Sequence, residues 1–161
     1  MGNSGIKWGT KLRVGEIKLL LGEYRFNLDD KGRITIPSKF RKNFKDGIVV
    51  TKGFENCLFV FTNTDWQDFS TQIKNLKTLK KDARLLSRFI FGGAAEDAPD
   101  KQGRVMLPQN LREWAGISKE VVIIGVGNRL EVWSKGNWQK TEKQAAESFS
   151  DIAEELADLG F

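Results

Sequence analysis

The chain contains no histidine and a single cysteine, Cys57, among its 161 residues. Without histidine, the common zinc sites and the usual general base of enzymes are excluded. A lone cysteine cannot form an intramolecular disulfide, and Cys57, followed by Leu58 and Phe59, fits a small buried apolar residue. An enzyme would need a site built from carboxylates or lysines, and the sequence shows no paired arrangement of such groups.

Long apolar runs are also missing. None approaches the roughly 20 residues that a membrane-spanning helix requires, and Leu19–Leu21 is too short for the core of a signal peptide. Apolar residues still make up 40% of the chain, which is enough for a real core in one domain or two small ones. The sequence therefore predicts a soluble cytoplasmic protein with no membrane partner.

The net charge of +5 is unevenly distributed. Residues 1–18 carry +3 and residues 141–161 carry −5, which leaves +7 on residues 19–140. Within that core, residues 22–61 and 62–92 each carry +3, whereas residues 93–133 carry −1. A basic patch is typical of proteins that bind a polyanion, although an ordinary solvated surface explains the same charge.

An internal repeat organises the sequence. The segment 29–41, DDKGRITIPSKFR, returns 71 residues later as DKQGRVMLPQNLR in segment 100–112. Asp, Gly, Arg, Pro and Arg recur at identical offsets, and Gly22 and Gly93 extend the match upstream. The chain is therefore two copies of one small supersecondary unit.

Each copy is predicted to run strand, turn, strand, short helix and hairpin. In the first copy, alternation predicts a strand over 23–28, followed by a turn at 29–32, a strand at 33–36, a helix at 38–44, and a hairpin from 48–51 and 57–61. The second copy ends with a hairpin from 120–125 and 129–133. About 40 residues are too few for an independent core, so the copies should pack on each other or on another subunit.

Two helices are expected between the copies, the first capped by Thr64, with a break near 77–81. The predicted boundaries are a disordered leader (1–18), a first repeat with its following helix (19–76), a helical linker (77–92), a second repeat (93–136) and an acidic amphipathic helix (137–161). The expected fold class is α+β.

The Asp-x-x-x-Arg turns are the candidate functional sites. Asp29 can accept backbone N–H bonds within its turn and hold the Arg33 guanidinium, with Gly32 closing the turn. Asp100, Gly103 and Arg104 repeat this pattern. A guanidinium fixed in this way has spare donors that match phosphate oxygens or the O6/N7 edge of guanine. Alternatively, both pairs are structural ion pairs that hold their turns together.

The two turns are not expected to be equivalent. Arg25 and Lys31 can lie beside Arg33, whereas their counterparts are Glu96 and Gln102, so the first turn is the better candidate for binding DNA. Lys39 and Arg41 add phosphate contacts or form a solvated helix surface, and Arg112 is open to pairing with a carboxylate at a subunit contact. The tryptophans suit core packing better than base stacking: Trp66, Trp114, Trp133 and Trp138.

The tandem turns, the opening GEYRFNLDDKGR from Gly22 and the segment DARLLSR over 82–88 together resemble the MraZ family, over residues 19 to about 160. The resemblance implies two tandem AbrB-like hairpin–helix repeats in a double-ψ or swapped-hairpin type of β-barrel core with flanking helices. It also implies a bacterial transcriptional regulator of the division and cell-wall gene cluster, associated with the nucleoid and assembled into an octameric or dodecameric ring. The family's DNA-contacting turn falls on Asp29 and Arg33, with Asp100 and Arg104 as the second copy.

The leading hypothesis is therefore a ring-shaped regulator that binds short direct repeats in double-stranded DNA, where several turns multiply a weak contact. It needs no cofactor, metal or small-molecule substrate. The alternative is a non-enzymatic scaffold whose turns bind only neighbouring subunits. The candidate DNA-binding residues are Arg25, Lys31, Arg33, Lys39, Arg41 and Arg104, and the turn-bracing residues are Asp29, Gly32, Asp100 and Gly103.

Overall fold

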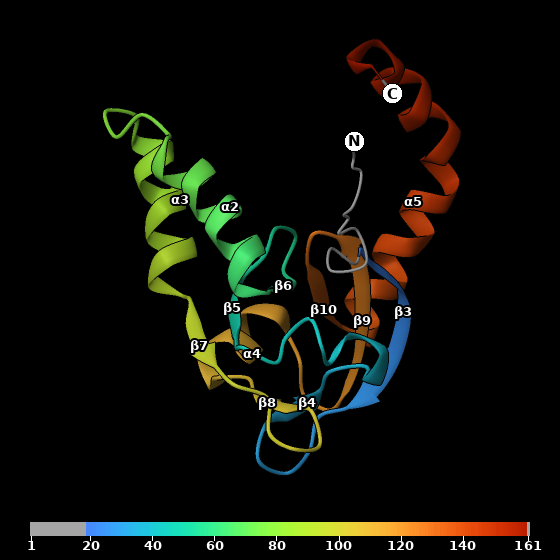
Figure 1. Ribbon diagram of the computed structural model, residues 1–161. Helices are drawn as coiled ribbons and strands as arrows, with labels where there is room; N and C mark the ends of the chain where they lie inside the picture. The colour runs from blue at the N-terminus through green and yellow to red at the C-terminus, as the bar shows by residue number, and fades with distance from the viewer. Residues whose placement is uncertain (1–18, 161) are drawn as a thin grey trace, which may run out of the picture.

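The computed structural model describes residues 19–160, and the prediction for residues 1–18 lies outside this range. Most of the strands form one six-stranded antiparallel sheet in the order β3-β9-β10-β6-β5-β7, and a two-stranded sheet, β4-β8, lies at one end of the molecule (Figure 1). The strands are β3 (Leu20–Asn27), β4 (Arg33–Thr35), β5 (Ile48–Lys52), β6 (Leu58–Phe61), β7 (Ala95–Asp97), β8 (Arg104–Met106), β9 (Glu120–Gly127) and β10 (Leu130–Ser134).

The helices cover the sheet from its sides. The α-helices are α2 (Asn63–Lys74), α3 (Lys81–Gly92), α4 (Gln109–Ala115) and α5 (Lys135–Leu156), and two short 3-10 turns are η1 (Ser38–Phe40) and η2 (Ala157–Leu159). In Figure 1, the α2–α3 hairpin and α5 rise on opposite sides of the sheet, away from β4 and β8. Among these described helices, none is long and apolar enough to cross a membrane.

Both sheets contain strands from both repeats. β3 of the first repeat pairs with β9 of the second, β10 pairs with β6 of the first, and Ile34 of β4 lies opposite Val105 of β8. The two repeats therefore form one domain, as expected for units that are too small to form a core of their own. The predicted α+β class is confirmed, but the six-stranded sheet is not closed into a barrel, because β3 and β7 remain its two edges.

The core is shared in the same way. Equivalent apolar residues of the two copies are fully buried in one cluster: Ile34, Ile36, Phe40, Val105, Leu107 and Leu111. A second cluster contains Cys57, Phe59, Phe61 and Trp133, with Trp66, Phe69 and Trp138 packed against it. The prediction of a buried Cys57 is confirmed, and burial raises the pKa of its thiol, which keeps it protonated. The tryptophans pack as expected.

The short helix predicted at 38–44 is the main local error. Only η1 forms, and its backbone bonds join residues three apart, such as the Arg41 N–H donating to the Ser38 carbonyl. The basic residues Lys39 and Lys42 would repel each other at helical spacing, and the segment is rich in like charge. Its counterpart α4 is a true α-helix in which Gln109 donates to Glu113.

The predicted cap of α2 is two residues too late. Thr62, not Thr64, is the N-cap, and its hydroxyl accepts a hydrogen bond from the Asp65 backbone N–H at 3.1 Å. The break between α2 and α3 and both predicted hairpins are present. The acidic helix begins at Lys135, where the Ser134 hydroxyl accepts from Asn137 N–H.

Candidate functional site

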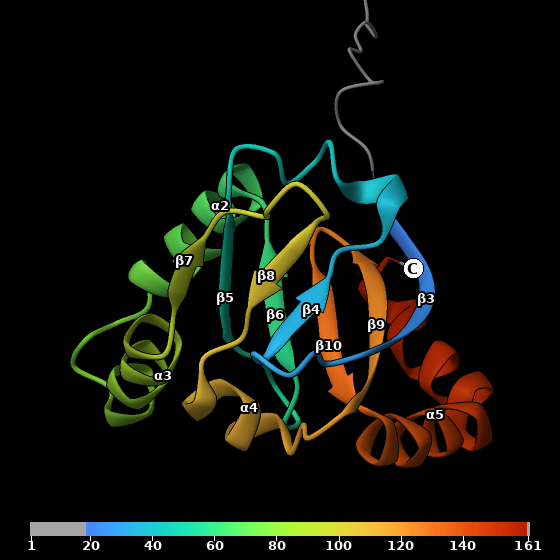
Figure 2. The same ribbon diagram turned by 90° about the horizontal axis from the view of Figure 1, so that it is seen from below.

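The two Asp-x-x-x-Arg turns lie side by side at the end of the molecule opposite the helical arms, where β4 and β8 meet (Figures 1 and 2). In the first turn, one carboxylate oxygen of Asp29 accepts from the backbone N–H groups of Lys31 and Arg33, both at 2.9 Å. The other oxygen accepts from Arg33 Nε at 2.7 Å. The carboxylate thus fixes both the turn and its arginine.

The second turn repeats this geometry. Asp100 accepts from the backbone of Gln102 and Arg104, both at 2.9 Å, and from Arg104 Nε at 2.8 Å. The pairing expected from the motif is therefore present in both copies. We call residues 29–33 and 100–104 together the paired turns.

The paired turns are joined to each other. The Ile36 N–H donates to the Gly103 carbonyl at 2.7 Å, and the Leu107 N–H donates to the Gly32 carbonyl at 2.9 Å. Arg33 Nη1 also lies 3.8 Å from an Asp100 carboxylate oxygen, so Arg33 contacts the acids of both turns. The two motifs form one rigid unit rather than two independent sites.

Each repeat also contributes an arginine that covers the turn glycine of the other repeat. Arg112 of the second repeat lies over Gly32 of the first turn, where an added Cβ would be 3.1 Å from Arg112 Cζ. Arg41 of the first repeat lies over Gly103, where an added Cβ would be 2.5 Å from Arg41 Nε. Both glycines are buried and have φ of +79°, so a side chain is disfavoured by backbone and neighbour alike.

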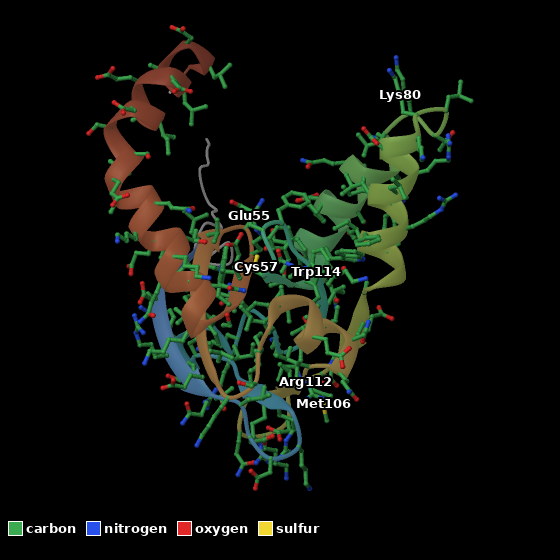
Figure 3. All side chains as sticks on the ribbon, turned by 180° about the vertical axis from the view of Figure 1, so that it is seen from behind. Glu55, Cys57, Lys80, Met106, Arg112 and Trp114 are labelled. Atoms are coloured by element: carbon green, nitrogen blue, oxygen red, sulfur yellow. The ribbon has the colours of Figure 1, made fainter. Side chains whose placement is uncertain are left out.

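Sequence reasoning missed this exchange. The sequence predicts a phosphate contact or a solvated helix surface for Arg41 and leaves Arg112 open to a carboxylate at a subunit contact, although each arginine follows the glycine of its own copy by nine residues. That constant spacing was the available signal. In the structure, Arg112 Nε donates to the Leu107 carbonyl at 2.9 Å, and Arg41 Nε to the Ile36 carbonyl at 3.4 Å. Figure 3 labels Arg112 near the end of the molecule that carries the paired turns.

The acids of the paired turns stay ionised. The backbone N–H of Arg33 holds the pKa of Asp29 below its usual value of 3.8; desolvation opposes this effect, and the Arg33 side chain adds to it. The same groups of Arg104 lower the pKa of Asp100. Basic side chains outnumber these acids and Asp30: Lys31, Arg33, Arg41, Lys101, Arg104 and Arg112. Lys101, exposed at the position equivalent to Asp30, was overlooked in the sequence.

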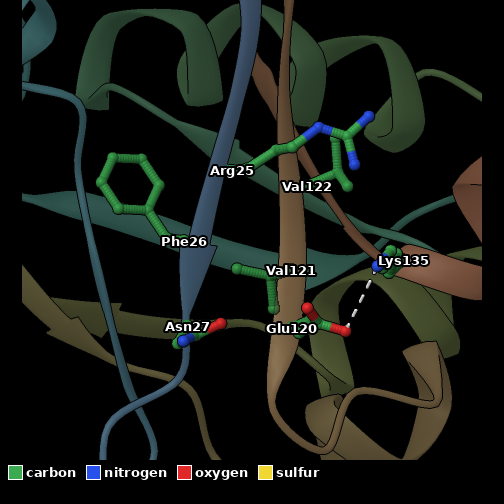
Figure 4. A pocket seen from close by; sticks show the side chains of 7 residues that line it. All are labelled: Arg25, Phe26, Asn27, Glu120, Val121, Val122 and Lys135. Atoms are coloured by element: carbon green, nitrogen blue, oxygen red, sulfur yellow. Dashed lines mark ion pairs between the residues drawn. The ribbon is translucent and has the colours of Figure 1, made fainter.

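Two other candidate residues lie outside the paired turns. Arg25, on β3, pairs with Glu23 at 2.8 Å and lines a pocket of about 290 Å³ near Glu120 and Lys135 (Figure 4). Arg25 lies on the six-stranded sheet and Arg33 on the two-stranded sheet, and their predicted cooperation in DNA binding stays a prediction. Lys39, on η1, lies with its ammonium 5.9 Å from the Tyr24 ring centre.

The part of the chain that the structure describes contains no candidate metal-binding site. There, no group of three or more His, Cys, Asp or Glu side chains is arranged to hold a metal ion. The chemistry that the paired turns offer is hydrogen bonding and charge: guanidinium and ammonium donors on a rigid frame.

Comparisons with known proteins agree with this description. The family model described as "MraZ protein, putative antitoxin-like" matches twice, over residues 19–89 and 90–160. A protein named transcriptional regulator MraZ from Natranaerobius thermophilus is 48% identical over 88% of this chain and 99% of its own.

Proteins of the same name show comparable similarity. The one from Desulforamulus reducens is 45% identical, and the one from Syntrophomonas wolfei is 48% identical, each over 88% of this chain and 99% of its own length. The double match coincides with the two repeats that share the paired turns. The chain belongs to the MraZ family.

Proposed function

We propose that this protein is a sequence-specific DNA-binding transcriptional regulator that uses the paired turns as its DNA-binding surface. The observation that carries this proposal is the rigid display of two carboxylate-braced arginines with exposed lysines at one end of the fold. The names of its relatives as transcriptional regulators support it, and such a role is not enzymatic.

The available donors define how DNA would be bound. Asp29 occupies Nε of Arg33 and Asp100 lies 3.8 Å from Nη1, which leaves Nη2 and the remaining N–H of Nη1 to meet a guanine edge in the major groove or a phosphate. Lys31 contributes a phosphate contact that sets the register. The Nε atoms of Arg41 and Arg112 donate to the carbonyls of Ile36 and Leu107. Their terminal nitrogens would contact the phosphate backbone. Arg25 and Lys39 would contact only DNA that extends beyond the paired turns.

One pair of turns covers few base pairs, so we propose that the protein acts as a homo-oligomeric ring, an octamer or a dodecamer, on short direct repeats. Turns displayed at fixed spacing engage successive repeats, and effective concentration multiplies their affinities. The proposal places the protein in the cytoplasm on the nucleoid, regulating the division and cell-wall gene cluster.

A second candidate is a scaffold without DNA affinity. It is favoured by the large apolar side chains that remain exposed on α3 and α5, including Phe89 and Phe149. A scaffold should elute from heparin or DNA resin at low salt, whereas the proposed regulator should be retained.

The decisive experiment is binding of Arg33→Ala to DNA from upstream of the protein's own gene. The proposal expects a large loss of affinity together with a shallower salt dependence. Arg129→Ala is the matched control, because Arg129 is equally shielded and pairs with Glu131 at 2.8 Å, but precedes β10, away from the turns. Unchanged affinity and salt slope in Arg33→Ala would refute the site.

A further inference from the structure

The two-stranded sheet β4–β8 turns one face outward at the end of the molecule that carries the paired turns (Figure 2). Ile34 of β4 and Val105 of β8 lie opposite each other and are both buried in the core. Because successive side chains of a strand point to opposite faces, the residues on either side of this pair face outward. We call these four residues the ribbon face: Arg33, Thr35, Arg104 and Met106.

The strand register divides the ribbon face into two unlike pairs. Arg33 lies directly opposite Met106, and Thr35 lies directly opposite Arg104. Residues opposite each other on antiparallel strands have Cβ atoms about 4.5–5.5 Å apart, so each arginine has one close neighbour across the ladder. The neighbour of Arg104 is the short, half-buried Thr35, whereas the neighbour of Arg33 is the longer and more exposed Met106.

Met106 is an apolar residue on an otherwise polar surface. It is 41% exposed, while the other three residues of the ribbon face are partly buried. Its backbone N–H donates to the Asp97 carboxylate at 2.9 Å, which holds the end of β8 in position. Figure 3 labels Met106 close to Arg112, at the end of the molecule that carries the paired turns. A fixed backbone thus presents an unbranched side chain that adapts to a surface placed against it.

The ribbon face has the shape and chemistry to read the major groove of DNA. That groove admits a two-stranded β-ribbon, whereas the deep and narrow major groove of RNA does not. Guanine presents the N7 and O6 acceptors there, and thymine presents its C5-methyl group. A guanidinium matches the first and an apolar side chain matches the second. Arg33 beside Met106 therefore matches a guanine beside a thymine.

Contact with the phosphate backbone does not account for Met106. Phosphate oxygens bind hydrogen-bond donors, and a thioether offers none. Met106 contributes to binding only where its apolar surface and that of a partner are both removed from water. On the base edges of the major groove, the thymine methyl is the group that meets this need.

We propose that Met106 is a specificity-determining residue that contacts a thymine methyl group, on the base pair next to the guanine that Arg33 contacts. This inference rests on the proposed function and names part of the sequence that the paired turns read. Neighbouring strands lie about 4.8 Å apart and successive base pairs about 3.4 Å apart, so side chains opposite each other reach neighbouring base pairs.

The test removes the thymine methyl groups one at a time. In duplex DNA from upstream of the protein's own gene, each thymine is replaced singly by uracil, which pairs with adenine in the same way but lacks the methyl group. The wild type should lose about fourfold in affinity at one thymine of each bound site, the effect expected for one methyl-sized apolar contact. Met106→Ala should bind the thymine and uracil duplexes equally at that position. Fluorescence anisotropy measures both.

Two further variants separate the contact from a general change in the surface. Met106→Leu keeps an apolar side chain of similar volume and should keep the preference for thymine. Val126→Ala is the matched control, because Val126 is 39% exposed on β9 of the other sheet, and it should behave as the wild type. Circular dichroism verifies that each variant is folded.

The position of the thymine relative to Arg33 is tested with 7-deazaguanine, which lacks the N7 acceptor. Replacing the guanine that Arg33 contacts should weaken binding by the wild type and by Met106→Ala, but not by Arg33→Ala. That guanine should adjoin the thymine at which uracil weakens the wild type. A guanine several base pairs away would contradict the side-by-side arrangement of the two side chains.

The two proposals fail on different results. If no thymine is sensitive to uracil, or if Met106→Ala keeps the preference for thymine, the role of Met106 is overturned, while DNA binding that depends on Arg33 leaves the proposed function intact. A changed assembly size of Met106→Ala in analytical ultracentrifugation, without any effect of uracil, would assign Met106 to a protein contact and also overturn its role. A wild type that binds none of these duplexes would overturn both proposals.

Discussion

The two turns share a backbone and differ in their exposed side chains. Their carboxylate bonds agree within 0.1 Å, and their glycines have the same φ of +79°. The first turn presents Asp30 and Lys31 where the second presents Lys101 and Gln102. The frame is thus fixed by the residues that recur, and any difference in binding must come from those that do not.

The structure also shows a second difference between the two turns, in the ion pairs of their arginines. The sequence attributed the advantage of the first turn partly to Arg25 against Glu96, but both lie on sheet strands outside the turns, in β3 and β7. Arg33 is instead distinguished by its contacts with the acids of both turns, Asp29 at 2.7 Å and Asp100 at 3.8 Å. Arg104 forms its ion pair with Asp100 of its own turn, at 2.8 Å.

Replacing the two arginines separately should show the largest contrast. Arg33→Ala should weaken DNA binding by about 1–3 kcal/mol per engaged turn, as for a lost bidentate base contact, and Arg104→Ala by less. The reason is that Arg33 holds both carboxylates in place. Fluorescence anisotropy with repeat-containing DNA measures both variants, with Arg33→Lys as the variant that keeps charge but not the planar fork. A larger loss in Arg104→Ala would invert the comparison.

The glycines should give a contrast in stability. Gly32→Ala and Gly103→Ala should each cost about 1–2 kcal/mol, the penalty of a left-handed backbone conformation for a residue with a Cβ. Gly103→Ala should cost more, because its Cβ would lie 2.5 Å from Arg41 Nε, against 3.1 Å from Arg112 Cζ at Gly32. Urea unfolding measures both. Equal losses would mean that the covering arginines move aside freely.

Changing Lys31 or Gln102, which occupy equivalent positions of the two turns, should alter DNA affinity less than the loss of Arg33. Lys31→Gln makes the first turn resemble the second, and it should reduce affinity for all DNA sequences and lower the salt slope by about one per turn. Gln102→Lys should do the reverse. Binding titrations from low to high salt measure the slopes. If neither slope changes, Lys31 makes no phosphate contact.

The smallest expected effect is on the pH dependence of stability. Because the folded pKa of Asp29 and Asp100 is below 3.8, each carboxylate adds stability above that value, and this stability is lost as pH falls through the lower folded pKa. Asp29→Asn and Asp100→Asn should therefore each flatten the loss of stability below about pH 4, to the same extent. Urea unfolding from pH 7 to pH 3 tests this. Unequal flattening would show that the turns are not electrostatically alike.

Local features were predictable from the sequence because local bonds determine them. The tight turns, the hairpins and the helices around Trp66 and Leu86 follow from residues close in the chain. The error at 38–44 is also local: Phe40 and Phe44 are buried as expected, but like charges leave only a 3-10 turn. The spacing of Phe40 and Phe44, which predicts the helix, takes no account of repulsion between like charges.

Long-range features were not predictable in the same way. The pairing of β4 with β8 and the position of Arg112 over Gly32 join residues about 70 or more positions apart, and the recurring glycine–arginine spacing does not by itself say which copy each arginine covers. The composition of each turn can be read from the sequence, but the neighbours that surround it cannot. The arrangement of the site therefore depends on how the two copies pack on each other.

The interleaving of the repeats gives the molecule a polarity. Two separate identical chains that paired β4 with its own equivalent would be related by a two-fold axis and would present the same side chains in both directions along a duplex. Joining the halves through α2 and α3 removes that constraint, so Lys31 and Gln102 can differ at equivalent positions. A chain built in this way has two unlike ends along a duplex, as the proposed binding to direct repeats of DNA requires.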